Sequence, residues 1–268
     1  MKRPTPHLQP LPLRVRAAPF EPAYGLLGRL AIRHGHSTSQ AFVVEMAFGI
    51  ADFVHEVECG RCLSELARLT RNAEAALAAS TLVTDPTGTL HIGAERISVT
   101  ANHHAVSAVG RICPHCLRAD LEMRDGPVTC RPHRRVWWDL AGVVSCPLHK
   151  VLLLYVCPGC GTHPSRVPAS PRYCRCGQDL IGLTGSPLDD ADLAADRYLI
   201  GRLGVVAAST HPLLDRMPLH DAAVAMLRIG QAAVLGARVT RFRNVCNDNF
   251  DVRRTSITLS CRNWIGQS

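Results

Sequence analysis

Aromatic residues are scarce in this chain of 268 residues. Six Phe, four Tyr and three Trp make up only 5% of it, although 47% of all residues are hydrophobic. The core must therefore be built mainly from the small aliphatic side chains of Ala, Leu and Val. This composition favours a mainly α fold, and the length corresponds to one large domain or two to three small ones.

Long apolar runs are also absent. A stretch such as Val151 to Val156 falls far short of the roughly 20 residues that span a bilayer. The N-terminal sequence MKRPTPHLQPLPLRVR carries Pro and Arg where a secretory signal would have an apolar segment. We therefore expect a protein without membrane association that works in the cytoplasm.

Catalytic motifs are missing as well. The chain contains no HExxH, GxSxG or GxxxxGK[ST] sequence, and Asp189 and Asp190 stand where a helix begins, as caps and dipole partners. We expect no enzymatic activity. Only Lys2 and Lys150 of the 30 basic residues are lysine, and the net charge of +8 by itself is weak evidence for nucleic-acid binding.

Cysteine, by contrast, is abundant and clustered. The reductants of the cytoplasm keep thiols reduced, so twelve cysteines in a cytoplasmic chain indicate metal binding rather than disulfides. Two ligands separated by two residues can reach one ion, and the turn between them directs backbone N–H groups at the sulfurs. Five pairs of candidate ligands occur between residues 113 and 177, four with two intervening residues and the last with one: Cys113/Cys116, Cys130/His133, Cys146/His149, Cys157/Cys160 and Cys174/Cys176.

These pairs predict two structural Zn²⁺ ions. Cys157, Cys160, Cys174 and Cys176 form one four-cysteine site, with glycine after each pair and no ligand position left for water. The other site begins with Cys113 and Cys116 and closes with either Cys146/His149 or Cys130/His133. The sequence C-P-L-H favours Cys146/His149, because its proline shapes the same turn as in the motifs CPHC and CPGC. Cys59 and Cys62 form a CxxC without a second pair nearby, which indicates structural thiols.

Periodicity divides the rest of the chain. Residues 1–18 form an extended arm, and residues 19–110 a helical region with helices over 21–34 and 39–48. The double zinc region covers 111–182 as tandem ribbons or knuckles, with the tryptophans of RRVWW in its core. Residues 183–236 carry C-terminal helices over 189–203 and 218–235. We expect an irregular connector over 84–110 and an irregular tail over 237–268.

Residues 61–83 are typical of a helix-turn-helix, although an ordinary helical hairpin has the same pattern. If the second helix enters a major groove, Arg71, Asn72 and Glu74 are the candidate readers of base edges. In the zinc region, the candidates for contacts with DNA phosphates are three arginines: Arg131, Arg134 and Arg135. Neutralisation of the nearby thiolates explains these three arginines equally well.

The succession CPHCL, RRVWW, CPLHK, VLLLYV and CPGCG resembles the TniQ family of transposon target-selection proteins. The opening PLPLRVRAAPFEPAYGLLGRLAIRHG is similar to the arm, glutamate and leucine-rich helix with which that family begins. The resemblance covers about residues 10–180. It implies a non-catalytic transposition accessory factor associated with the nucleoid, and DNA, a transposase and an AAA+-type ATPase regulator as partners. It also favours Cys146/His149 as ligands.

Other functions remain open from the sequence alone. A zinc-containing transcriptional regulator or a protein-interaction module would show the same helices and zinc motifs. A zinc-dependent enzyme is a weaker alternative, because the closed four-cysteine site offers no position for a reacting water. The sequence also leaves homodimerisation open.

Overall fold

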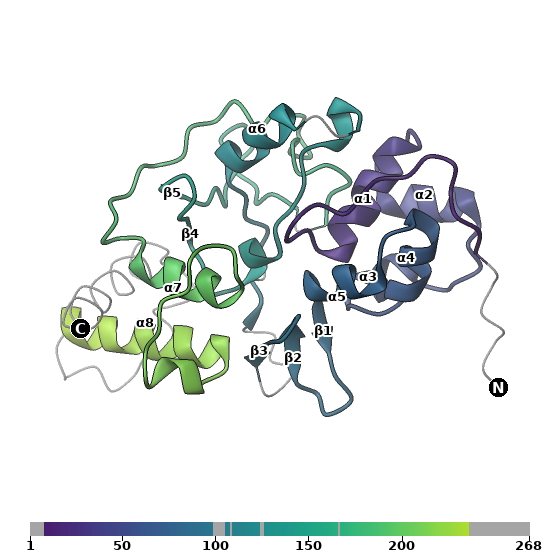
Figure 1. Ribbon diagram of the computed structural model, residues 1–268. Coiled ribbons are helices and arrows are strands. Elements are labelled where there is room, and N and C mark those ends of the chain that lie inside the picture. Colours follow the sequence, from purple (N-terminus) through teal and green to yellow (C-terminus); the bar gives the residue numbers. More distant parts are fainter. Residues whose placement is uncertain (1–7, 99–104, 108, 124–125, 166, 236–268) are drawn as a thin grey trace.

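The computed structural model describes residues 8–98, 105–107, 109–123, 126–165 and 167–235 (Figure 1). The predicted tail over 237–268 lies outside the described residues. Eight α-helices and two small sheets occur in the described ranges, which agrees with the predicted mainly α fold. Figure 1 shows the N-terminal helices on one side, the cysteine-rich segment above, and the C-terminal helices below it.

The N-terminal region is a cluster of short helices around α1 (Ala23–Arg33), which agrees with the predicted helix over 21–34. Nine consecutive residues of α1 are buried, because helices pack on more than one of its faces. The others are α2 (Ser39–Met46), α3 (Phe53–Glu58), α4 (Leu63–Thr70) and α5 (Glu74–Ala79). The cap of α2 is Thr38, whose hydroxyl accepts from the Ala41 N–H at 3.1 Å.

The arm lies in an ordered position along this cluster. Leu8, Leu11 and Val15 are buried in the N-terminal core, and the Leu11 N–H donates to the Leu69 carbonyl of α4 at 2.9 Å. The arm therefore covers the face of α4 that would otherwise leave apolar side chains exposed.

The prediction of an irregular connector over 84–110 was wrong in its first part. Residues 82–98 form an antiparallel sheet of β1 (Leu82–Thr84), β2 (Leu90–Ile92) and β3 (Glu95–Ser98). The first turn is the DPTG segment, where Asp85 Oδ1 accepts the N–H groups of Thr87 at 2.8 Å and Thr89 at 3.0 Å. Strands of three or four residues are too short to show an alternating pattern, which is why the sequence did not reveal them.

The cysteine-rich segment builds its core around two tryptophans. Trp137 and Trp138 are both fully buried and meet edge to face with ring centroids 5.7 Å apart. Around them lie α6 (Pro114–Glu122), the 3-10 turns η2 (Val128–Cys130) and η3 (Val136–Asp139), and the strand pair β4 (Ser145–Cys146) and β5 (Val151–Leu152). These elements are short, so the tryptophans supply much of the buried apolar surface.

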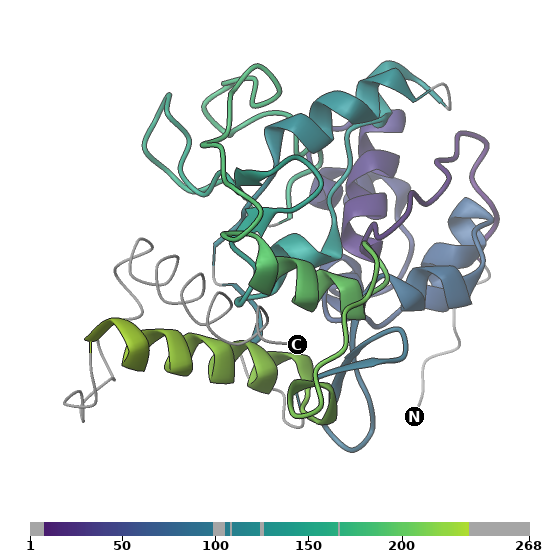
Figure 2. The ribbon, with the colours of Figure 1, turned by 60° about the vertical axis from the view of Figure 1, so that its left-hand side comes forward.

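The C-terminal helices pack beneath this core. The helix α7 (Ala194–Arg202) is followed by the 3-10 turn η4 (Leu214–Arg216) and by α8 (Leu219–Leu235), near the ranges predicted. Figure 2 shows α8 beside α7 at its beginning and extending outward in its later turns. Arg202 of α7 pairs with Glu95 of β3 at 2.6 Å, which ties the helix to the sheet.

The buried Arg29 joins α1 to the cysteine-rich segment. Glu21 and Arg29 lie 2.5 Å apart, and the Arg29 guanidinium also donates to the Cys130 carbonyl at 2.5 Å. Gly28 on the same helix allows close approach, since a Cβ there would lie 2.7 Å from the Pro168 carbonyl oxygen. Within the described residues, we found no helix with the length and apolarity that crossing a membrane requires.

Candidate metal centres

The first cluster gathers Cys113, Cys116, Cys146 and His149, with the three cysteines buried. Cys113 and Cys116 come from the start of α6, and Cys146 ends β4 just before the turn that carries His149. The Nδ1 atom of His149 lies 3.7 Å from Cys113 Sγ, 3.3 Å from Cys116 Sγ and 3.5 Å from Cys146 Sγ. All three sulfurs thus face the same ring nitrogen, and the Cys116 N–H donates to Cys113 Sγ at 3.4 Å.

The second cluster gathers Cys157, Cys160, Cys174 and Cys176. Cys157 Sγ lies 3.8 Å from Cys176 Sγ, and Cys160 Sγ lies 3.7 Å from Cys174 Sγ. In each of these two contacts, one sulfur belongs to the Cys157/Cys160 pair and the other to the Cys174/Cys176 pair. Cys160 and Cys176 are exposed, so this cluster lies at the surface whereas the first is mostly enclosed.

The distances between the sulfurs fit coordination of a tetrahedral metal ion better than they fit disulfide bonds. A disulfide needs two sulfurs about 2.05 Å apart. Zinc at about 2.3 Å from each sulfur places tetrahedral sulfurs about 3.8 Å apart. The measured separations of 3.6 Å between Cys116 and Cys146, and of 3.7 Å and 3.8 Å in the second cluster, match this spacing. Both clusters can therefore hold a metal ion.

Crowding of the thiols perturbs their acidity. Interaction with Cys113 raises the pKa of Cys116 and raises that of Cys146 to about 12. The Thr162 hydroxyl beside Cys160 lowers the pKa of that surface thiol to about 6. Thiolates packed this closely repel one another, and a bound dication would remove the repulsion by favouring the charged form of each ligand.

Cys130 and His133, the alternative pair, lie outside the first cluster. Cys130 belongs to η2 and is buried, with its carbonyl accepting from Arg29. The His133 Nδ1 lies 3.1 Å from the Arg131 carbonyl and 3.2 Å from Asp120 Oδ2. The Cys130 carbonyl thus contacts α1, and the His133 ring is engaged within the cysteine-rich segment. Cys59 and Cys62 are absent from both clusters; the Cys59 Sγ contacts the His55 ring at 3.6 Å.

The α7 helix supplies a support for the first cluster that the sequence did not indicate. Asp196 is buried and accepts the N–H groups of Val144 at 3.2 Å and Ser145 at 2.9 Å, as well as the Ser145 hydroxyl. Ser145 directly precedes Cys146, so Asp196 holds the backbone that presents this thiol. Desolvation raises the pKa of Asp196 to about 6. Nothing in the spacing of the motif points to a residue so distant in sequence.

Arg134 and Arg135, two of the candidate phosphate contacts, both form ion pairs inside the protein. Arg134 is 1% exposed and pairs with the buried Asp139 at 2.7 Å. Arg135 pairs with Asp120 at 2.6 Å and stacks over Trp138, with its guanidinium carbon 5.1 Å from the ring centroid. Both charges therefore stabilise the core.

The other candidate contacts separate into two groups. Arg71 and Glu74 are exposed at the turn between α4 and α5. Arg131 is half-buried and donates to the carbonyls of Leu121 at 2.7 Å and Gly126 at 3.2 Å. Asn72 is also engaged internally, because its amide contacts the arm. Two helices, α4 and α5, thus occur over 61–83. Of the three candidate base readers there, Arg71 and Glu74 are exposed, whereas the Asn72 side chain is hydrogen-bonded to the arm.

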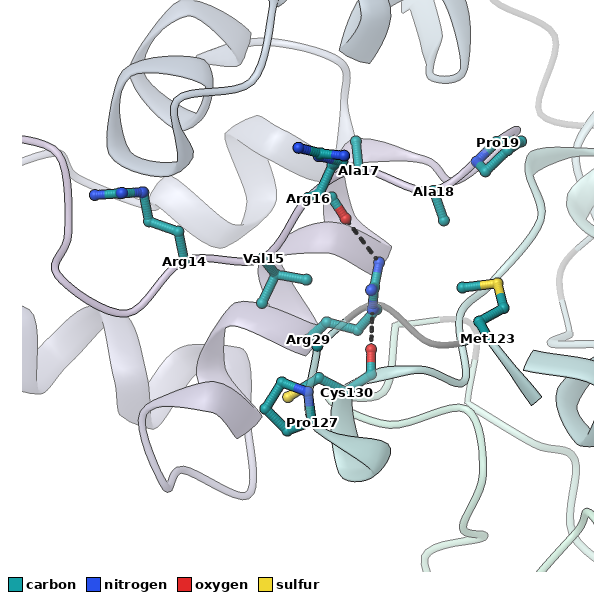
Figure 3. Close-up of a pocket in the computed structure, with 11 residues that line it drawn as sticks. Arg14, Val15, Arg16, Ala17, Ala18, Pro19, Arg29, Met123, Pro127 and Cys130 are labelled. Atoms are coloured by element: carbon teal, nitrogen blue, oxygen red, sulfur yellow. Dashed lines mark hydrogen bonds between the residues drawn. The ribbon is translucent and has the colours of Figure 1, made fainter. Parts of the chain in front are cut away.

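A pocket of about 200 Å³ lies where the arm crosses the cysteine-rich segment (Figure 3). Its walls are the arm from Arg14 to Pro19, Arg29 on α1, and four residues of the cysteine-rich segment: Met123, Gly126, Pro127 and Cys130. The Arg29 guanidinium spans it, donating to the Arg16 carbonyl at 3.3 Å on one side and to Cys130 on the other. In Figure 3, the Arg14 and Arg16 side chains extend away from Met123 and Pro127.

The chain matches a known protein family. The TniQ family model matches residues 12–153, which is more than half of the chain and includes the first cluster. No individual curated protein matches the sequence.

Proposed function

The chain belongs to the TniQ family of transposition accessory proteins, and from this membership we propose that it selects or docks at a target site and recruits the transposase and an AAA+-type ATPase. Two zinc ions hold its central segment together, at Cys113, Cys116, Cys146 and His149 and at the four cysteines of the second cluster. The proposal assigns it no catalytic step. The family match is the observation that carries the proposal.

The proposed role of zinc is structural. Each cluster offers four protein ligands, which complete a tetrahedral ion and leave no position for substrate or a reacting water. When bound, zinc supplies cross-links between short elements that bury little apolar surface alone. The chain's own residues do the remaining work: the ligands close the loops, and Asp196 holds the backbone at Ser145.

Direct contact with duplex DNA is proposed through the arm and the turn between α4 and α5. Asn72 supports this arrangement, because its Oδ1 accepts the Ala17 N–H at 3.0 Å and its Nδ2 donates to the Val15 carbonyl at 3.1 Å. Val15 is buried while Arg14 and Arg16 on either side of it are exposed. Arg71, which precedes Asn72, is exposed as well.

We define Arg14, Arg16 and Arg71 as the basic arm surface. The hydrogen bonds to Asn72 hold the arm against the helix turn, so the three guanidinium groups lie on adjoining segments of chain. A duplex presents a dense row of phosphates to such a surface, and each neutralised phosphate releases close to one counterion. In this arrangement Asn72 orients the arm instead of reading a base.

A binding titration tests the duplex contact. Fluorescence anisotropy with a labelled duplex at two salt concentrations should give a steep salt dependence for the wild-type protein. The Arg14→Ala plus Arg16→Ala variant should weaken binding to all sequences and reduce the salt slope. Arg216→Ala serves as the matched control, since Arg216 is exposed on η4, away from the arm. Equal binding by both variants would exclude the basic arm surface.

Recruitment is tested separately from DNA binding. If the wild-type protein fails to bind duplex at low salt but retains a purified partner ATPase, the helices dock a protein and targeting is indirect. Size-exclusion chromatography with light scattering in the same experiment decides whether the protein acts as a monomer or a homodimer.

A further inference from the structure

The second cysteine cluster carries an exposed aromatic ring, Tyr173, which follows Arg172 and precedes Arg175 in the sequence. Tyr173 is 48% exposed, although its backbone is fixed in an antiparallel bridge with Asp179. The guanidinium carbon of Arg172 lies 4.9 Å from the centroid of the Tyr173 ring. A cation at this distance is attracted by the electrons of the ring, so it restricts where the ring can turn. The ring is thus held at the surface without being covered by apolar side chains.

Arg172 is itself held firmly. Its Nε and a terminal nitrogen donate to Asp179 Oδ2 at 3.0 Å and 2.6 Å, and Asp179 Oδ1 accepts the Ile181 N–H at 3.1 Å. The carboxylate of Asp179 is therefore neutralised by a neighbour. An anionic ligand approaching Tyr173 would not meet an uncompensated negative charge at this carboxylate.

Arg175 adds a second positive charge two residues after Tyr173 in the sequence. It stands between the ligand candidates Cys174 and Cys176 and is exposed. Within the part of the chain that the structure describes, no side-chain hydrogen bond or ion pair engages its guanidinium. Its charge is consequently available to a ligand, while the two flanking cysteines anchor its backbone.

We infer that Arg172, Tyr173 and Arg175 form a binding surface for unpaired bases of a single-stranded nucleic acid. Tyr173 stacks on one base, Arg172 supports the ring, and Arg175 contacts a neighbouring phosphate. A duplex keeps its base faces stacked internally, so an exposed ring offers it little, whereas an unpaired base of any identity presents a face for stacking. The surface rests on the proposed zinc at the second cluster and is separate from the basic arm surface.

The inference is tested by anisotropy with three labelled probes: oligo(dT) and oligo(U) of roughly 12 nucleotides, within the site sizes of known single-strand binders, and a duplex. Tyr173→Ala should weaken binding of single strands by about tenfold or more, and Tyr173→Phe should preserve it, because stacking needs the ring and not the hydroxyl. Arg175→Ala should weaken binding and reduce its salt dependence. The two single-stranded probes distinguish DNA from RNA as the source of the bases.

Controls separate this inference from the proposed function. Every variant should keep the zinc content of the wild-type protein, measured by atomic absorption, so that loss of the fold is not read as loss of contact. Arg14→Ala plus Arg16→Ala should reduce duplex binding and leave the Tyr173-dependent binding of single strands in place. Arg216→Ala should alter neither. The inference is overturned if the wild-type protein binds neither single-stranded probe, or if Tyr173→Ala with full zinc content binds them as the wild-type protein does.

Discussion

Replacement of Arg134 should lower the free energy of unfolding of the protein, because its guanidinium forms a buried ion pair in the core. The guanidinium is 1% exposed and lies 2.7 Å from the carboxylate of Asp139, which is fully buried. It also donates to the carbonyls of Ser165 at 3.2 Å and Arg111 at 3.3 Å, and its carbon lies 5.8 Å from the Trp138 centroid. Arg134→Met keeps most of the side-chain volume but removes the charge and these donors.

The expected loss is large. Removing one partner of a buried ion pair typically costs about 3–5 kcal/mol, because the other charge stays buried without its counterion. The total free energy of unfolding of a protein is about 5–15 kcal/mol, so the variant loses a substantial share of it. Urea denaturation followed by tryptophan fluorescence measures the change, since Trp137 and Trp138 lie in the same core.

Two further variants make the result interpretable. Arg216→Ala, at an exposed position, should change the free energy of unfolding by about 0.5 kcal/mol or less. Arg134→Met combined with Asp139→Asn should recover part of the loss, because the buried negative charge is then gone. An Arg134→Met protein as stable as the wild type but with weakened duplex binding would refute this reasoning and restore Arg134 as a phosphate contact.

Three other outcomes are expected. Cys146→Ser should lower the zinc content from about two to about one per chain while Cys130→Ser leaves it unchanged, measured by atomic absorption; the reverse pattern would assign the site to the other pair. Gly28→Val should lower the melting temperature by calorimetry, because a Cβ there meets the Pro168 carbonyl oxygen at 2.7 Å; an unchanged melting temperature would contradict that packing. Since the pKa of Asp196 is raised to about 6 in the folded state, its contribution to stability is fully present below pH ~4, the unfolded pKa, and is lost as pH rises through about 6. The difference in unfolding free energy between the wild type and Asp196→Asn should therefore fall across this range, and a constant difference would contradict the raised pKa.

The sequence predictions that agree with the structure depend on local patterns, namely the helical spacing of apolar residues and the ligand spacing of cysteines. The apolar residues of α1 recur at helical spacing, and α1 lies within the range predicted from them. The cysteine pairs have ligand spacing, so any fold that forms the tight turn brings the two members of a pair together. The members of each knuckle could thus be recognised before the fold was known. The three short strands escaped notice because three or four residues contain too little pattern.

Tertiary structure alone decided which distant groups meet. Sequence spacing left Cys130/His133 and Cys146/His149 both open, and the chain brings the second pair to Cys113 and Cys116. Asn72 looked like a base reader, but the arm, more than fifty residues away in sequence, takes up its amide. Arg134 pairs with Asp139 because η3 places the Asp139 carboxylate in the core. An ionisable or polar side chain takes its role from the partner that compensates its burial, and that partner is set by the path of the whole chain.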